Sequence, residues 1–408
     1  MFPFDRIHLE ASKTVGIYVM LTSGFGLWPL HENTLLLRTI WLVSSFEMIL
    51  MTSGGIYELY FNYDFGERSV DTLLTIAFAF TSLMKLIFYF IKRDYLRSNI
   101  ESAIEDWSST EATQVDSITR KYKKIYEMAI KSYLTIGGMS VGMYFLRKYF
   151  FDQDIIVEVT TWDEELQMET TMNVTKQRFL FPTIFISSNV SPTFRNLLNI
   201  NNLLQSVICV GTNVGSDCFF MTITYHLCGQ FQILKNRFAS FEKVQSEEKT
   251  KCEFGFLVDR QQRLLVLTKS IETSQNIIMF FLVFTNLILF NAAGIQFLIS
   301  IKKNEKYNAI PHFVVITYTL AQTFIYACIS EDLSDEIEHV SRSIYESNWQ
   351  SLPNSMARDV YFLMILSHTT VYLTGGKLFP MKKTTFTQFF KTSVSYLSVF
   401  NAMIDQYL

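Results

Sequence analysis

Several runs of about 20 predominantly apolar residues interrupt the chain, and this is the length that an α-helix needs to cross a hydrocarbon core about 30 Å thick. The clearest runs are Leu73–Ile91, Ile277–Ile301 and Phe313–Ile329. Weaker candidates are Leu36–Tyr57, Ala129–Tyr149, Leu203–Leu227 and the pair Val360–Leu373 and Phe386–Met403. These runs predict an all-α integral membrane protein with seven transmembrane helices, the last of them split into two segments.

The composition supports a membrane protein and not two or three soluble domains. Of 408 residues, 49% are hydrophobic and only 18% are charged. A formal net charge of −3 gives no indication of nucleic-acid binding. Four of the five cysteines lie in apolar spans and Cys252 lies in a charged connection, so we expect all five to be reduced. The six histidines show no metal-binding spacing, and no cofactor is expected.

Basic residues predict the orientation in the membrane, because Lys and Arg concentrate in cytoplasmic connections. A cytoplasmic amino terminus places the basic groups at 92–97, 120–124 and 235–263 inside, although Lys302, Lys303 and Lys306 then lie outside. The loop at about 150–200 becomes extracellular, and it holds two glycosylation acceptor triplets, at Asn173 and Asn189. Seven spans then leave the carboxyl terminus outside, which is the reverse of G-protein-coupled receptors.

One domain is expected over residues 1–408, with the following parts. They are a cytoplasmic amino-terminal segment (1–34), the first four spans (35–227), a cytoplasmic extension and loop (228–263), the fifth and sixth spans with a cytoplasmic anchor region (264–356), and the split seventh helix (357–408).

Polar residues inside the spans are costly in lipid and must face a partner or water. Asp217 is in the middle of the fourth span, where a buried hydrogen-bonding role is favoured over a ligand or ion contact. Lys85 lies near enough to a span end for its ammonium to reach the interface. Glu47 lies deeper, and the sequence assigns it no partner.

The last apolar segment is two-faced at helical spacing. Small and polar residues follow one another at steps of three and four along one face: Thr384, Gln388, Lys391, Ser395, Ser398 and Ala402. The remaining faces carry Phe386, Phe390, Val394 and Leu397. A Gly-x-Ser-x-Gly match at Gly138–Gly142 lies inside a predicted membrane helix and lacks the strand that a nucleophile elbow requires, so an enzyme is not expected.

Three stretches resemble insect odorant receptors. "TYTLAQTFIYACISEDLSDEIEHVSRSIYESNWQSLP" (317–353) is similar to the family's sixth span and following loop, and "TITYHLCGQFQILKNRF" (222–238) to the end of its fourth span. "LTGGKLFPMKKTTFTQFFKTSVSYLSVF" (373–400) is similar to the split seventh helix, with Tyr396 and Val399 in the family's Tyr-x-x-Val pattern. The resemblance covers roughly the second half of the chain.

The resemblance implies a tetramer around one central pore, with the polar face of the last helix towards water. The pore residues would be Gln388, Lys391, Ser395, Ala402 and Met403, with Val399 forming an apolar gate. The implied function is an odorant-gated, non-selective cation channel in the plasma membrane, surrounded by lipid and opened by a small, volatile, largely apolar ligand. The resemblance places the ligand within each subunit, and the positions that could line its site include Phe78, Met139, Met143, Val210, Val315, Tyr318 and Thr319, although a core role is favoured for each of them taken singly.

A short connection between the fourth and fifth spans, and Ser330-Glu331 where the family usually has Gly-Asn, favour a ligand-tuned subunit over the family's co-receptor. A heterotetramer with the odorant receptor co-receptor is therefore implied. Two alternatives remain. A gustatory receptor of the same superfamily is disfavoured because no Gln-Phe follows Tyr396, and a G-protein-coupled receptor would need the opposite topology.

Overall fold

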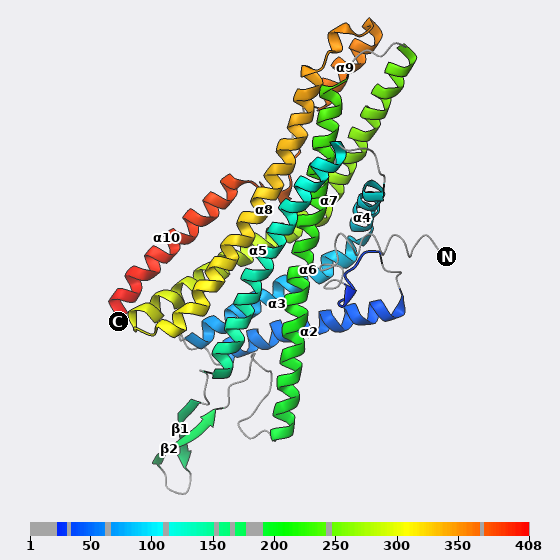
Figure 1. The fold of residues 1–408 in the computed structure, drawn as a ribbon. Helices are drawn as coiled ribbons and strands as arrows, with labels where there is room; N and C mark the ends of the chain where they lie inside the picture. The colour runs from blue at the N-terminus through cyan, green and yellow to red at the C-terminus, as the bar shows by residue number, and fades with distance from the viewer. Residues whose placement is uncertain are drawn as a thin grey trace.

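The computed structural model describes residues 23–30, 34–61, 67–108, 114–150, 155–163, 168–176, 191–241, 247–367 and 371–407. Most of these residues are helical (Figure 1). They are α2 (Leu35–Phe61), α3 (Glu67–Ile91), α4 (Arg93–Ser108), α5 (Gln114–Phe150), α6 (Pro192–Ala239), α7 (Glu247–Lys302), α8 (Lys306–Glu346), the short 3-10 helix η1 (Trp349–Ser351), α9 (Asn354–Ser367) and α10 (Lys383–Tyr407). The strands are β1 (Ile155–Asp163), β2 (Met168–Lys176), β3 (Thr374–Gly375) and β4 (Phe379–Pro380).

Five of these helices are long and apolar enough to cross a membrane, namely α2, α3, α6, α7 and α8. Each of them contains one of the spans that the sequence predicts. The helices α5 and α10 have sufficient length, at 37 and 25 residues, but are more polar. The count of seven spans therefore remains a prediction, while the helical fold, with five helices that could cross a membrane, is confirmed.

The three helices α6, α7 and α8 are much longer than a membrane is thick. At 1.5 Å per residue, the 56 residues of α7 extend about 84 Å. Figure 1 shows α9 at one end of the molecule and the β1–β2 hairpin at the other, with the long helices between them. The segment 228–263, predicted as an extension and a loop, is largely helical, because α6 continues to Ala239 and α7 begins at Glu247. Cys252 thus lies on α7 and not in a loop.

The break in the last segment is present, and a small hairpin fills it. Gly376 and Lys377 have φ of 59° and 61°, and Leu378 donates its backbone N–H to the Gly375 carbonyl at 3.0 Å, as in a type I′ turn. Gly376 N–H also bonds to the carbonyl of Asn276 at 2.7 Å, which attaches the hairpin to α7. The hairpin that precedes α10 is therefore fixed against the bundle.

A second hairpin was not predicted. Strands β1 and β2 pair antiparallel over nine residues each, in the connection expected to be extracellular. Asn173 lies on β2 opposite Glu158. Asn189 lies outside the described residues.

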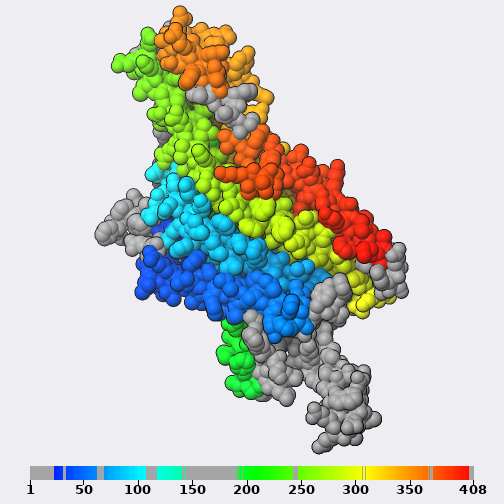
Figure 2. Space-filling view, turned by 180° about the vertical axis from the view of Figure 1, so that it is seen from behind, coloured from blue at the N-terminus to red at the C-terminus, as the bar shows by residue number. Residues whose placement is uncertain are grey.

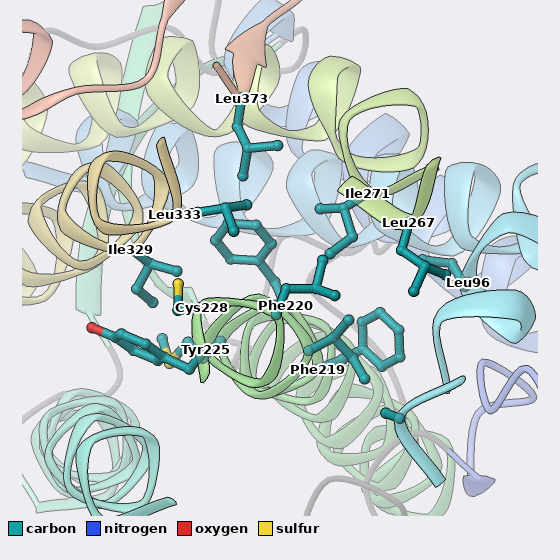
Figure 3. Packing of buried hydrophobic residues seen from close by; sticks show 14 of the residues in the cluster. Leu96, Phe219, Phe220, Tyr225, Cys228, Leu267, Ile271, Ile329, Leu333 and Leu373 are labelled. Atoms are coloured by element: carbon teal, nitrogen blue, oxygen red, sulfur yellow. The ribbon is translucent and has the colours of Figure 1, made fainter. Parts of the chain in front are cut away.

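The centre of the bundle is α6, whose residues from Gly211 to Gly229 are all buried. It contacts α3, α5, α7 and α8. Figure 3 shows Phe219, Phe220 and Cys228 of α6 surrounded by side chains of the neighbouring helices. Phe220 stacks on Tyr326 of α8 with ring centroids 4.5 Å apart. Helix α10 lies instead along the outside of the bundle, as Figure 2 shows in red.

An ionic cluster attaches α4 to α6 and α7. Asp106 of α4 accepts from Arg260 Nη2 at 2.7 Å and contacts His226 Nε2 at 3.1 Å. Burial alone would raise the pKa of Asp106, but hydrogen bonds and charge from His226 and Arg260 outweigh it and lower that pKa below the usual value. Asp106 is therefore a carboxylate at neutral pH, held between two helices.

Candidate functional site: a buried polar network and an exposed terminal helix

A fully buried ion pair lies in the middle of the bundle. Lys85 Nζ of α3 is 2.6 Å from Asp217 Oδ1 of α6, and both side chains are 0% exposed. Lys85 Nζ also donates to the carbonyl of Asn213 at 3.2 Å. The expectation that Lys85 reaches the membrane interface is wrong, because its ammonium is directed inward to a carboxylate that would otherwise be an unpaired buried charge.

Three further donors complete the environment of Asp217. The Tyr326 hydroxyl donates to Oδ1 at 2.5 Å, and Gln322 Nε2 donates to Oδ2 at 2.8 Å. The Tyr133 hydroxyl of α5 also donates to Oδ2. An ionised carboxylate offers about four acceptor positions, and here all four receive a donor. The buried hydrogen-bonding role expected for Asp217 is confirmed.

The network continues into α7. Asn286 Nδ2 donates to Gln322 Oε1 and to Thr323 Oγ1, each at 3.0 Å. Side chains of α3, α5, α6, α7 and α8 are thereby joined in one set of polar contacts. Such a network fixes the relative positions of helices that apolar contacts alone would allow to slide.

Tyr318 is at the edge of this network, on α8. Its hydroxyl oxygen is 2.6 Å from that of Tyr133, and its side chain is buried. Its ring lies near Tyr133 and near Phe78 of α3, with centroid distances of 5.6 and 6.0 Å. On α5, a Cβ built on Gly137 would lie 3.7 Å from the Tyr318 ring. The structure thus brings two of the predicted ligand residues, Phe78 and Tyr318, together.

The other predicted ligand residues are distributed around this pair. Val315 and Phe78 pack on the same small apolar cluster, and Val210 is half-buried against the main core. Thr319 is fully buried, but its hydroxyl donates to the Ile316 carbonyl of its own helix at 2.9 Å. Met139 is 53% exposed on α5, two residues beyond Gly137, and so projects away from Tyr318. The side chain of Met143 lies outside the described part of the molecule.

Sequence reasoning missed most of the network. One signal was available, because Tyr318, Gln322 and Tyr326 follow at four-residue steps and so share a face of α8. The partners of Glu47 were also missed. Asn201 Nδ2 and Gln205 Nε2, both on α6, donate to Glu47 Oε2 at 3.3 and 3.0 Å.

Helix α10 has one packed face and one exposed face. Ser393 is 0% exposed, and a Cβ on Gly294 of α7 would be 2.5 Å from Leu397 Cδ2, so α10 approaches α7 closely. The predicted pore residues all lie on exposed positions of the single chain: Gln388, Lys391, Ser395, Val399, Ala402 and Met403. At 100° per residue, Ser395 lies about 160° around the helix from Leu397.

The first residue of α10 is held by α8. The backbone N–H of Lys383 donates to Glu331 Oε2 at 2.9 Å, and its ammonium lies 3.6 Å from the same oxygen. Nearby, Phe386 and Phe324 make an edge-to-face contact at 5.2 Å. The helix that carries Tyr318 therefore also holds the beginning of α10.

The family model for the 7tm odorant receptor matches residues 66–394. Two solved structures share the fold. The structure of the insect olfactory receptor OR5 from Machilis hrabei has a TM-score of 0.74 at 10% identity and covers 97% of this chain and 98% of its own. The structure of that receptor in complex with eugenol has a TM-score of 0.75 at 12% identity and covers 98% and 100%. No curated protein matches the sequence.

The matched family segment runs from the start of α3 into α10, and so contains the buried network, Tyr318 and Val394 of the terminal helix. The solved receptor structures extend the likeness of the backbone to nearly the whole chain. The chain therefore belongs to the 7tm odorant receptor family.

Proposed function

We propose that the protein is a subunit of an odorant-gated, non-selective cation channel of the plasma membrane, with seven spans and a cytoplasmic amino terminus. The observation that carries the proposal is the division of α10 into a packed face at Ser393 and an exposed face at Ser395 and Val399. A polar stripe turned towards lipid would be unfavourable. A water-filled pore shared by four subunits removes that cost.

In this arrangement the exposed face of α10 lines the pore. Gln388, Lys391 and Ser395 offer polar groups to passing cations, while Val399 and Met403 form apolar levels. A ring of valines narrows the pore, and a hydrated ion cannot cross it without losing water that no ligand replaces. Val399 is therefore the proposed gate.

The ligand binds beside Tyr318, within each subunit. Phe78, Val210, Val315 and Thr319 contribute mostly apolar surface, and Met139 and Met143 remain proposed contacts. Movement of α8 on ligand binding reaches α10 through Glu331 and Phe324, which hold Lys383 and Phe386. This path supplies the mechanical link between the ligand and the gate.

The chain acts as the ligand-tuned subunit of a heterotetramer with the odorant receptor co-receptor. Cells that express both chains should show odorant-evoked inward current when a panel of volatile compounds is applied. Cells that express this chain alone should show little or none. Currents of equal size without the co-receptor would contradict the partnership, and absence of any evoked current with it would contradict the channel function.

Replacing Tyr318 with alanine should raise the odorant concentration for half-maximal current by roughly tenfold or more, because a buried aromatic contact is worth about 1.5–3 kcal/mol. The reversal potential should not change, since the Tyr318 side chain packs against α3 and α5 and is not part of the proposed pore lining on α10. The control is Tyr307→Ala, which removes a 76% exposed tyrosine from the same helix. Unaltered odorant responses in Tyr318→Ala channels would exclude Tyr318 from the ligand site.

A further inference from the structure

The buried ion pair determines where the proton of Tyr133 lies. Asp217 faces the ammonium of Lys85 at 2.6 Å with no exposure of either side chain, so it is a carboxylate and can only accept. The single hydroxyl proton of Tyr133 is donated to Asp217 Oδ2. Tyr133 then has no proton left for Tyr318, whose oxygen lies 2.6 Å away. Tyr318 must be the donor in that contact.

This assignment leaves the Tyr318 oxygen as an acceptor only. A tyrosine hydroxyl has one proton, and that of Tyr318 is used by Tyr133. Among the described residues, no other side chain or backbone group makes a hydrogen bond to the Tyr318 oxygen. The nearest amide on the same face of α8, Gln322 Nε2, is directed to Tyr133 at 3.0 Å and to Asp217 at 2.8 Å. The oxygen therefore has unused lone pairs, on a side chain whose ring lies near the apolar ring of Phe78.

We propose that the ligand donates a hydrogen bond to the Tyr318 oxygen, so that the receptor prefers alcohols and phenols to ethers, esters and ketones of the same size. The inference rests on the proposed function, because it names the chemical class that the proposed ligand site accepts. The carbon skeleton of such a ligand contacts Phe78 and Val315, and its hydroxyl group faces Tyr318. A ligand with acceptors alone meets only the lone pairs of Tyr318.

Isomeric pairs of compounds separate this hydrogen bond from size and volatility. Benzyl alcohol and anisole are isomers, as are heptanol and hexyl methyl ether, and every other active alcohol or phenol from an odorant panel is compared with its isomeric ether. Currents are recorded from the full chain with the co-receptor. Each alcohol should reach half-maximal current at a concentration about threefold to tenfold below that of its ether, the value of one hydrogen bond.

Two variants test the proton positions. Tyr318→Phe keeps the ring and removes the oxygen, so the alcohol-to-ether ratio should fall to about one. Tyr133→Phe removes the group that accepts the Tyr318 proton, and the released hydroxyl should then favour ethers and ketones. The control is Tyr89→Phe, which removes a buried hydroxyl that donates to the Ser216 carbonyl at 2.8 Å and should leave the ratio unchanged.

Equal potency of alcohols and ethers in the parent receptor would overturn the inference, as would an unchanged ratio in Tyr318→Phe. A parent receptor in which only ethers or ketones evoke current would overturn the inference as well. Absence of current for every compound would instead contradict the proposed channel function. Surface labelling identifies any variant that fails to fold, and in that case the ratio measured in the parent alone decides.

Discussion

Replacing Lys85 with methionine is expected to remove most of the protein from the cell surface. The change leaves the carboxylate of Asp217 fully buried without its cation. Breaking a buried ion pair on one side costs about 3–5 kcal/mol. The total stability of a folded domain is only about 5–15 kcal/mol, so the loss is a large share of it. Surface labelling of a tagged receptor, together with thermal unfolding in detergent, measures the effect.

The double variant Lys85→Met with Asp217→Asn should recover a substantial part of the surface signal. Asparagine removes the buried charge and keeps an oxygen that can accept from Tyr133 or Tyr326. Lys303→Met is the matched control, since it removes an exposed lysine. Normal surface levels of the single Lys85→Met variant would show that the pair does not stabilise the fold.

Replacing Val399 with asparagine is expected to produce current in the absence of odorant. Val399 is 58% exposed on the face of α10 that carries Ser395. At the proposed apolar constriction, an amide would supply oxygens to a partly dehydrated cation and admit water, which would lower the barrier of the closed state. Resting conductance should rise several-fold, and relative cation permeabilities should change. In the proposed heterotetramer only some subunits carry the change, so we expect a smaller rise than four substituted subunits would give.

The control for this variant is a valine on another side of the same helix. Val394 is 41% exposed and lies about 140° around α10 from Val399 at 100° per residue. Val394→Asn should leave resting conductance near the parental level. If Val399→Asn channels reach the membrane normally and show parental resting current and selectivity, Val399 does not face the narrow part of the pore.

The sequence pattern within one segment was sufficient to predict those features that depend on that segment alone. The lengths of the apolar runs predicted α2, α3, α6, α7 and α8, because any helix of that composition must be enclosed by lipid or protein. Residue spacing along α10 assigned Ser395 and Leu397 to different faces of the helix. In the structure Leu397 packs against Gly294 of α7, and Ser395 is exposed. In both cases the signal lies within a single helix.

Contacts between distant segments were not predictable in the same way. Lys85 and Asp217 are 132 residues apart, and nothing near either residue indicates the other. Position within a span misled the interpretation of Lys85, since six residues separate it from the end of α3 and yet its side chain turns inward. The extension of α7 back to Glu247 was missed, because a polar, charged helix resembles a loop in hydropathy.

Cysteine modification along α10 in open channels tests the central claim most directly. Ser395→Cys and Val399→Cys replace exposed positions, and Ser393→Cys replaces a position that is 0% exposed against the bundle. A positively charged thiol reagent, applied with odorant to cells that also express the co-receptor, should reduce the evoked current of the first two variants irreversibly. It should leave Ser393→Cys and the parent, with its five native cysteines, unaffected. Block of Ser393→Cys without block of Ser395→Cys and Val399→Cys would contradict the account, because the packed face and not the polar stripe would then line the pore.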